Sequence, residues 1–335
     1  MDSLSQLALG AAVGVAVMGR RTAVWKAALW GGVCGTLPDL DVFIDHGDPI
    51  RNMTLHRAET HAPFWLTLAS LPIAAGIATL HRERDRWRRW WLAVWLALVT
   101  HPLLDAMTVY GTQLLLPFTD RPLGVGSIFI IDPLYTVPLL VGVVAALTVR
   151  SPRGLGWNIA GLVLSTAYLG WGVAAQQHVK GVAEAALRAQ GIAAERVLVT
   201  PTAFNTVLWR IVAVSGDGSW HEGFHGLLDA DRNLTFDRFD QGQTWREALR
   251  GDWHAERIVW FSRGFYKFAK VDERVIVTDL RMGQEPFFTF AFEIARLASP
   301  PVPVPVKSVG DRGDIGTALR WLWQRMWGER LPPPR

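Results

Sequence analysis

Seven acidic and histidine side chains fall within or beside apolar stretches of the chain. They come from four separate stretches and are Asp39, Asp41, His56, His61, His101, Asp105 and Asp132. Ionisable residues in membrane segments are costly, so they generally have a partner and a function. Neutral imidazole with carboxylate oxygen is a ligand set for zinc, manganese or iron. The pattern predicts a divalent metal site, and a helix-packing hydrogen bond or a proton relay is the plainer interpretation of any single member.

The spacing of these residues suits hydrolytic chemistry. His101 and Asp105 are four residues apart, which puts both on one face of a helix. Asp39 and Asp41 are two residues apart and could serve one metal each or bridge a pair. A bound divalent ion would lower the pKa of its water towards 7 and supply hydroxide. Asp132 precedes a proline, so it either caps a helix or acts as a base.

Six apolar segments position these residues. Half of the chain's residues are apolar, 19% are charged and 17 are tryptophan, a balance that suits a chain partly in lipid. The segments are residues 4–18, 23–37, 62–80, 90–116, 128–149 and 155–175. A membrane span needs about 20 residues, which the last four segments reach, whereas the first two could form a tilted or re-entrant pair. Residues 1–175 are therefore predicted to be a mainly α-helical transmembrane bundle of about six apolar helices.

The arginines of three loops predict the orientation of the bundle. They are Arg20 and Arg21, then the five arginines of residues 82–89, then Arg150 and Arg153. Positive loops stay in the cytoplasm, so residues 38–61, residues 117–127 and everything after residue 176 should face outward. His101 and Asp105 would lie roughly 17 Å and 22 Å into their segment, at a rise of 1.5 Å per residue. The site is thus expected near the outer, periplasmic face of a multi-pass inner-membrane protein.

The chain changes character after residue 175. Residues 176–190 suit a helix that leaves the membrane, and runs with β-branched and aromatic residues follow at 196–200, 206–214, 258–261, 275–279 and 287–292. A proline-rich strap at 300–305 leads to a tryptophan-rich amphipathic helix near 314–329, which either packs on the domain or lies on the membrane surface. Residues 176–335 are therefore predicted to form a smaller, mostly β extramembrane domain.

Several function classes find no support in the sequence. The single cysteine, Cys34, allows neither an internal disulfide nor a cysteine-based zinc site. The net charge of +4 is small and scattered, so we expect no nucleic-acid partner. His221-Glu222-Gly223-Phe224-His225 matches the H-E-x-x-H pattern of zinc proteases, which works only on a helix. Gly223 and the preceding turn residues instead indicate a strand or a turn.

Several ordered motifs of the first 150 residues resemble a known family. They include the start Met1-Asp2-Ser3-Leu4-Ser5-Gln6, Pro38-Asp39-Leu40-Asp41, the stretch from His56 to His61, the stretch from His101 to Gln113, and Ile131-Asp132-Pro133-Leu134-Tyr135. Together they look like the YdjM-like family of membrane-bound metal-dependent hydrolases, in its extended bacterial branch. The resemblance implies that Asp39, Asp41, His56, His61, His101 and Asp105 match the metal-binding positions.

Two positions depart from the family pattern. Ala58 stands where the family commonly has glycine, and Ala62 where it commonly has serine. Both imidazoles of the motif remain, so metal binding is still expected. Loss of a hydroxyl at position 62 could retune His61, because groups around a ligand orient it and tune the metal.

Three functions are compatible with this set of residues. The first is a metal-dependent hydrolase of an ester or phosphoester, lipid-linked in view of the depth of the site, with the six residues as metal ligands and Asp132 as a base or orienting group. The second is a transporter or ion-handling protein using the same cluster, although the segments show no clear internal repeat. The third is a scaffold that a metal only braces. We expect the hydrolase, with zinc before manganese or iron and with the lipid bilayer as a partner.

Overall fold

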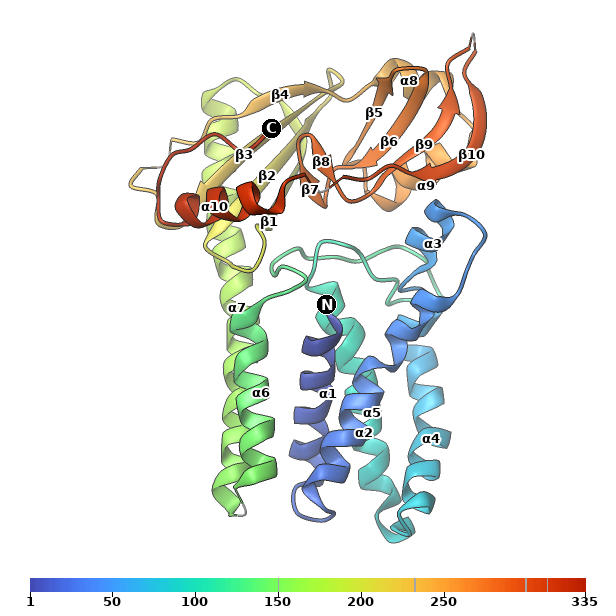
Figure 1. Cartoon of the computed structure of the whole chain (residues 1–335), viewed down its shortest axis with the longest axis vertical. Coiled ribbons are helices and arrows are strands. Elements are labelled where there is room, and N and C mark those ends of the chain that lie inside the picture. The colour runs from blue at the N-terminus through green and yellow to red at the C-terminus, as the bar shows by residue number, and fades with distance from the viewer. Residues whose placement is uncertain (150, 232, 299, 312) are drawn as a thin grey trace. The chain divides into compact units, whose positions relative to one another are not determined.

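The structure of the chain is a computed structural model that describes residues 1–149, 151–231, 233–298, 300–311 and 313–335. Arg150, one of the arginines that predicted the orientation, lies outside the described residues. About half of the chain is helical, and a region rich in strands follows the long helices (Figure 1). The chain divides into two compact units, which are described separately. Unit 1 comprises residues 1–44, 56–173 and 203–205, and unit 2 the remainder.

Unit 1 is built from apolar helices that run alongside one another (Figure 1). They are α1 (Ser3–Met18), α2 (Val24–Thr36), α4 (Pro63–Leu80), α5 (Trp87–Ala106), α6 (Pro133–Thr148) and the first part of α7 (Pro152–Ala189). Their starts follow helix-capping chemistry: Asp2 accepts hydrogen bonds from the first-turn amides of α1, and a proline opens α4 and α6. Helix α1 packs against α2, α5 and α6, so it lies at the centre of the unit.

Small residues let α1 and α2 approach backbone to backbone. A Cβ atom added to Gly10 would lie 2.2 Å from the carbonyl oxygen of Gly31, and one added to Gly35 would lie 2.6 Å from that of Gln6. Close contact through small residues is a common way for apolar helices to associate. This contact fixes the end of α2, from which the next segment enters the site.

The apolar helices differ from the predicted membrane segments in length. Among the described residues, two helices, α4 and α7, are long and apolar enough to cross a membrane, whereas α1 and α6 are shorter apolar helices. A transmembrane bundle of about six helices therefore stays a prediction. The predicted segment at 90–116 was wrong at its end, because α5 stops at Ala106 and Thr108 follows in a turn. The segment at 155–175 is part of a 38-residue helix that continues through residues 176–189, as the predicted exit helix requires.

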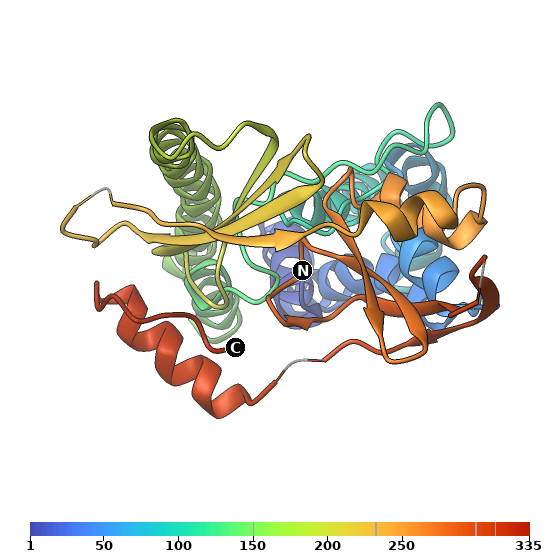
Figure 2. The ribbon, with the colours of Figure 1, turned by 90° about the horizontal axis from the view of Figure 1, so that it is seen from above.

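Unit 2 contains two four-stranded antiparallel sheets and a short hairpin. The first sheet has the order β1 (Ala194–Pro201), β2 (Leu208–Ser215), β3 (Ser219–Gly226) and β4 (Asp237–Asp240). The second has the order β10 (Val302–Ser308), β9 (Ala291–Arg296), β6 (Arg274–Asp279) and β5 (Tyr266–Val271), and β7 (Gly283–Gln284) pairs with β8 (Phe287–Phe288). Unit 2 also holds the second part of α7 and the helices α3 (Pro49–Leu55), α8 (Gln243–Ala248), α9 (Trp253–Phe261) and α10 (Ile315–Met326). Helix α10 is the red helix near the C-terminus in Figure 2.

Three sequence predictions for unit 2 needed correction. Residues 258–261, predicted as a strand, end helix α9, whose start is capped by the Asp252 side chain accepting from the Ala255 amide. Residues 287–292 are divided between β8 and β9. The proline-rich strap is largely the edge strand β10, a position that tolerates proline because one side of the strand needs no hydrogen-bond donors.

Candidate metal centre

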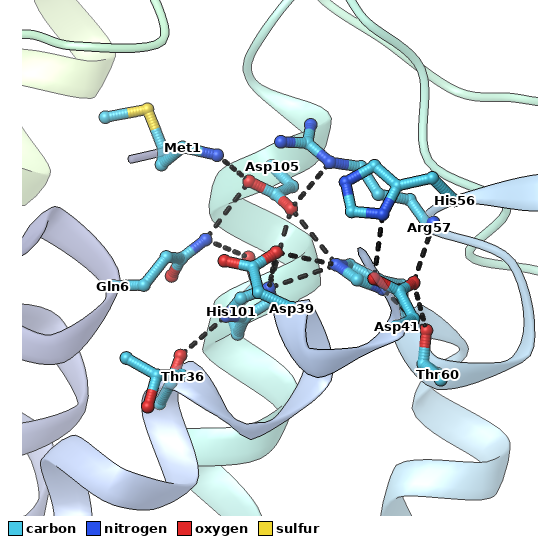
Figure 3. Close-up of polar contacts among 12 residues, drawn as sticks. Met1, Gln6, Thr36, Asp39, Asp41, His56, Arg57, Thr60, His101 and Asp105 are labelled. Atoms are coloured by element: carbon cyan, nitrogen blue, oxygen red, sulfur yellow. Dashed lines mark hydrogen bonds and ion pairs between the residues drawn. The ribbon is translucent and has the colours of Figure 1, made fainter. Parts of the chain in front are cut away.

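Two short 3-10 turns and one helix of unit 1 carry most of the predicted ligands. Asp39 and Asp41 lie on a 3-10 turn, η1 (Leu37–Phe43), that directly follows α2. His61 ends a second 3-10 turn, η2 (Glu59–His61), just before α4. His101 and Asp105 lie on the last part of α5 and face the same side, as their spacing of four predicts. Figure 3 shows Asp39 of η1 pointing toward His101 and Asp105 of α5.

Four of these side chains form one compact group, consisting of Asp39, His61, His101 and Asp105. The Nε2 atoms of His61 and His101 are 3.1 Å apart. Asp39 Oδ1 lies 3.5 Å from His61 Nε2 and 3.4 Å from His101 Nε2, and Asp105 Oδ2 lies 3.4 Å and 3.5 Å from the same two atoms. Four atoms held about 2.0–2.1 Å from a tetrahedral ion are about 3.3–3.4 Å from one another. These five distances therefore match a single tetrahedral metal site, and all four ligand atoms lie within 4.8 Å of one another.

Hydrogen bonds outside the group set the histidine tautomers. His101 Nδ1 lies 2.6 Å from the carbonyl oxygen of Gly35, which can only accept, so Nδ1 carries the proton and Nε2 keeps its lone pair. His61 Nδ1 lies 2.9 Å from Thr60 Oγ1, which in turn donates to Asp41 over 2.6 Å. Both Nε2 lone pairs thus point at two carboxylates. The lone pairs and the carboxylate oxygens repel one another unless a cation or a proton lies between them.

The charges of the group show the same preference for a cation. Burial alone would lower the pKa of His61, but hydrogen bonds to Asp105, Asp39 and Asp41 outweigh it and raise the pKa to about 9. Burial acts in the opposite sense on the carboxyl groups of Asp39 and Asp41, yet the neighbouring histidines hold both pKa values below their usual range. The carboxylates therefore stay charged and available as ligands at neutral pH.

Asp41 and His56 lie beside the four-residue group. Asp41 accepts from the Arg57 amide over 3.0 Å, and one of its oxygens lies 2.7 Å from His56 Nδ1. Its contact with His61 is through Nδ1, the ring nitrogen that faces away from the group. Asp41 therefore orients His61, as the carboxylates behind metal-bound histidines do. Ligand roles for Asp41 and His56 stay predictions.

Asp132 lies at the start of α6. Its side chain accepts from the Leu134 amide over 3.0 Å and from the Tyr168 hydroxyl over 2.9 Å. These contacts match the capping role that the following proline suggested. Among the described residues, the contacts of Asp132 do not include any of the four grouped side chains. Its catalytic role therefore stays a prediction.

Sequence reasoning missed three residues that contact Asp105. Oδ1 of this carboxylate faces the Met1 amino group and accepts from Gln6 Nε2 over 3.1 Å, whereas Oδ2 faces Arg57 Nε at 3.2 Å (Figure 3). Arg57 could have been noticed, because it is the one basic residue inside the His56–His61 motif. Met1 and Gln6 belong to the first family-like motif, but nothing in that motif indicated a contact with Asp105, since their position depends on how α1 packs on α5.

The H-E-x-x-H pattern of unit 2 lies on strand β3, as its glycine and turn residues indicated. Two side chains four residues apart on a strand are roughly 13 Å apart, too far for one ion. Glu222 points to other partners, and its carboxylate is bound by Arg210 over 2.7 Å and by Arg335 over 2.8 Å. The protease interpretation is therefore wrong.

Comparison with known proteins gives two matches. The model of the YdjM inner membrane protein family matches residues 1–179, which include every residue of the metal centre. The uncharacterized protein YfhP of Bacillus subtilis (strain 168) is 27% identical over 149 residues, or 43% of this chain and 45% of the relative. The chain thus matches less than half the length of that relative. No solved structure matches. With more than half of its length inside the family match, the chain belongs to the YdjM inner membrane protein family.

Proposed function

We propose that the protein is a membrane-bound metal-dependent hydrolase of esters or phosphoesters. The observation that carries the proposal is the convergence of two imidazole Nε2 atoms and two carboxylate oxygens at 3.1–3.5 Å spacing. We propose zinc as the ion, with manganese or iron also suited to these ligands. A divalent ion held there supplies Lewis acidity and lowers the pKa of a water molecule that it binds.

The four ligands differ in their access to solvent, and this suggests where a substrate enters. His61, His101 and Asp105 are fully buried, whereas Asp39 is 19% exposed at its side chain. Asp39 therefore marks the open side of the centre. We propose that a substrate approaches from the Asp39 side, because a hydrolytic metal centre needs an accessible position beside its ligands.

His56 is the residue best placed to move a proton. Its side chain is 22% exposed, its Nδ1 contacts Asp41, and its ring centre lies 5.9 Å from that of His61. An imidazole oriented by a carboxylate through one nitrogen can accept or give a proton through the other. We propose that His56 does this for the attacking water or the leaving group, a role that the sequence analysis predicted for Asp132.

The metal content of the purified full-length protein tests the centre. Wild type should carry about one transition-metal ion per chain by elemental analysis, and Asp105→Ala and His101→Ala should lose it. His178→Ala, at an exposed position of α7, is the matched control and should keep it. A wild-type protein that takes up no metal would refute the proposal.

A metal that only braces the helices is the competing function, because four protein ligands close a tetrahedron as they do in structural zinc sites. His56→Ala separates the two functions. In a hydrolase it should keep the metal and lose at least about 100-fold in turnover, the usual contribution of a proton-transfer group. A wild-type protein that holds its metal but cleaves no ester or phosphoester would favour the bracing role.

A further inference from the structure

Arg57 is held in an uncommon backbone conformation next to the metal centre. Its φ angle is +64°, in the left-handed region that disfavours residues with a Cβ atom. Both of its backbone groups are bound: the amide donates to Asp41 Oδ2 over 3.0 Å, and the carbonyl oxygen accepts from the Gln113 amide over 3.0 Å. Residues kept in such conformations gather at functional sites. The backbone thus fixes where this side chain points.

The guanidinium of Arg57 has more donors than its neighbours use. The side chain is 6% exposed, its Nε faces Asp105 Oδ2 at 3.2 Å, and its Nη1 lies 3.4 Å from Thr108 Oγ1. Its Cζ lies 4.8 Å from the centre of the Tyr110 ring, which limits its rotation. A guanidinium carries five N–H donors, and these two acceptors among the described residues leave terminal donors for a ligand.

The charge balance of the site depends on this residue. The centre contains the carboxylates of Asp39 and Asp105, and the cationic groups that contact Asp105 are the Arg57 guanidinium and the Met1 amino group. Without Arg57, the centre would lose one of these two cationic groups and would attract an anion less strongly. A neutral carboxylic ester has no need of the guanidinium, whereas a phosphoryl group does, because a guanidinium fork matches two phosphate oxygens.

We propose that Arg57 is a substrate-binding residue that holds a phosphoryl oxygen beside the metal, so that the substrate is a phosphoester. This inference rests on the proposed hydrolase function and narrows it to one substrate class. The phosphoryl group could belong to a lipid headgroup or to a soluble phosphoester, and both present the same oxygens to Arg57.

Inorganic phosphate is the probe for this inference. Its affinity for metal-loaded full-length protein in detergent would be measured by calorimetry, with elemental analysis of the same samples. Arg57→Gln should keep the metal and weaken phosphate binding at least tenfold. Arg57→Lys keeps the positive charge but not the guanidinium group, so its phosphate affinity should lie between those of wild type and Arg57→Gln. Arg88→Gln, the same change at an exposed arginine, should match wild type.

The source of the phosphoryl group is tested by turnover of bis(p-nitrophenyl) phosphate in solution and of phosphatidylglycerol in mixed micelles. Cleavage of either supports the inference if Arg57→Gln slows it, and cleavage of neither overturns it. Unchanged phosphate binding in Arg57→Gln also overturns it, as does loss of metal from both Arg57 variants, which would make Arg57 a support for Asp105. If metal-loaded wild-type protein does not bind phosphate, only the inference about Arg57 is overturned. If wild-type protein takes up no metal, the proposed hydrolase function is overturned as well.

Discussion

At the scale of single residues, the centre depends on which partner each of the two ring nitrogens of a histidine contacts. His101 gives its Nδ1 proton to a backbone carbonyl, and His61 directs its Nδ1 to Thr60 and Asp41. Each ring therefore keeps Nε2 for a cation. Position 62 is alanine and offers no hydroxyl, but the Thr60 hydroxyl reaches His61 Nδ1 and keeps the ring oriented.

We expect Thr60→Val to weaken metal binding about 10- to 100-fold, the usual effect of removing a group that orients a metal-bound histidine. The reason is that His61 Nδ1 and Asp41 both lose the hydroxyl that joins them. The measurement is competition with a fluorescent chelator. Thr60→Ser keeps the hydroxyl and should restore affinity. Equal affinities of Thr60→Val and wild type would show that the hydroxyl plays no part.

Metal affinity should rise with pH. The pKa of His61 is raised to about 9 in the metal-free protein, so an ion must displace its proton at any lower pH. Each unit of pH below about 9 should therefore cost about tenfold in apparent affinity. Titrations between pH 6 and 8 by the chelator assay test this, and a flat profile would contradict it.

The stability of the metal-free protein should follow pH in the opposite direction. A group whose pKa is raised on folding stabilises the fold fully below its unfolded pKa, about 6.5 for histidine, and loses this contribution as the pH passes its folded pKa of about 9. The His61 contribution to metal-free stability thus declines as the pH rises, while metal binding strengthens.

The sequence predicted which side chains gather better than it predicted their arrangement, because four of the predicted residues lie in one compact group. The spacing of His101 and Asp105 determined that they share a helix face, and the structure agrees. Spacing along the chain could not show that Asp39 faces the centre while Asp41 faces His56 and Thr60, because that division depends on how the η1 turn is folded. The backbone conformation of Arg57 was likewise beyond any sequence pattern.

At the scale of elements, the contact between α1 and α2 supports the metal centre. Gly35 belongs to this contact, and its carbonyl oxygen also accepts the His101 Nδ1 proton. The close approach of the two helices therefore sets the position of a metal ligand on a third helix, α5. Sequence reasoning noted the two apolar segments as a pair but gave no role to their glycines.

We expect Gly35→Ala to destabilise the protein by about 1–3 kcal/mol, a typical cost of overpacking. Its Cβ would lie 2.6 Å from the Gln6 carbonyl oxygen and 2.9 Å from Gly10 Cα, both in backbone that cannot easily move. Thermal unfolding in detergent is the measurement. Gly76→Ala in α4, where a Cβ would meet nothing within 4 Å, is the control and should leave stability unchanged or slightly raised. Equal melting of the two variants would contradict the argument.

Element boundaries were predicted least well where apolar composition continues past a helix end. Residues 107–116 remain apolar enough to extend a segment, but the helix ends at Ala106 and Thr108 donates its hydroxyl to the Asp105 carbonyl oxygen instead. Residues 258–261 are β-branched and aromatic, which suits a strand, yet the Asp252 cap starts a helix there. A local hydrogen bond decided each case, and composition does not report it.

At the scale of the whole molecule, the membrane orientation is still a prediction from arginines. We expect cysteines placed at Asp120 and Arg320 in a Cys34→Ser background to react with an impermeant maleimide on intact spheroplasts. A cysteine at Arg88 should react only after the membrane is permeabilised, because positive loops stay in the cytoplasm. All three positions are exposed in the structure, so exposure within the protein does not confuse the result. Labelling of Arg88→Cys on intact spheroplasts would indicate the opposite membrane orientation.

Helix α7 has a practical consequence for anyone who wishes to divide this protein. Its 38 residues run without a break from unit 1 into unit 2, and Ala175, Val179 and Ala183 pack with Trp209 and Ile211 in a buried cluster. A fragment that begins at the first strand would lack the helix residues of that cluster. The indole and aliphatic side chains that they cover would then be exposed and would promote aggregation. Expression of the β region by itself should therefore succeed only when the fragment retains this stretch of helix.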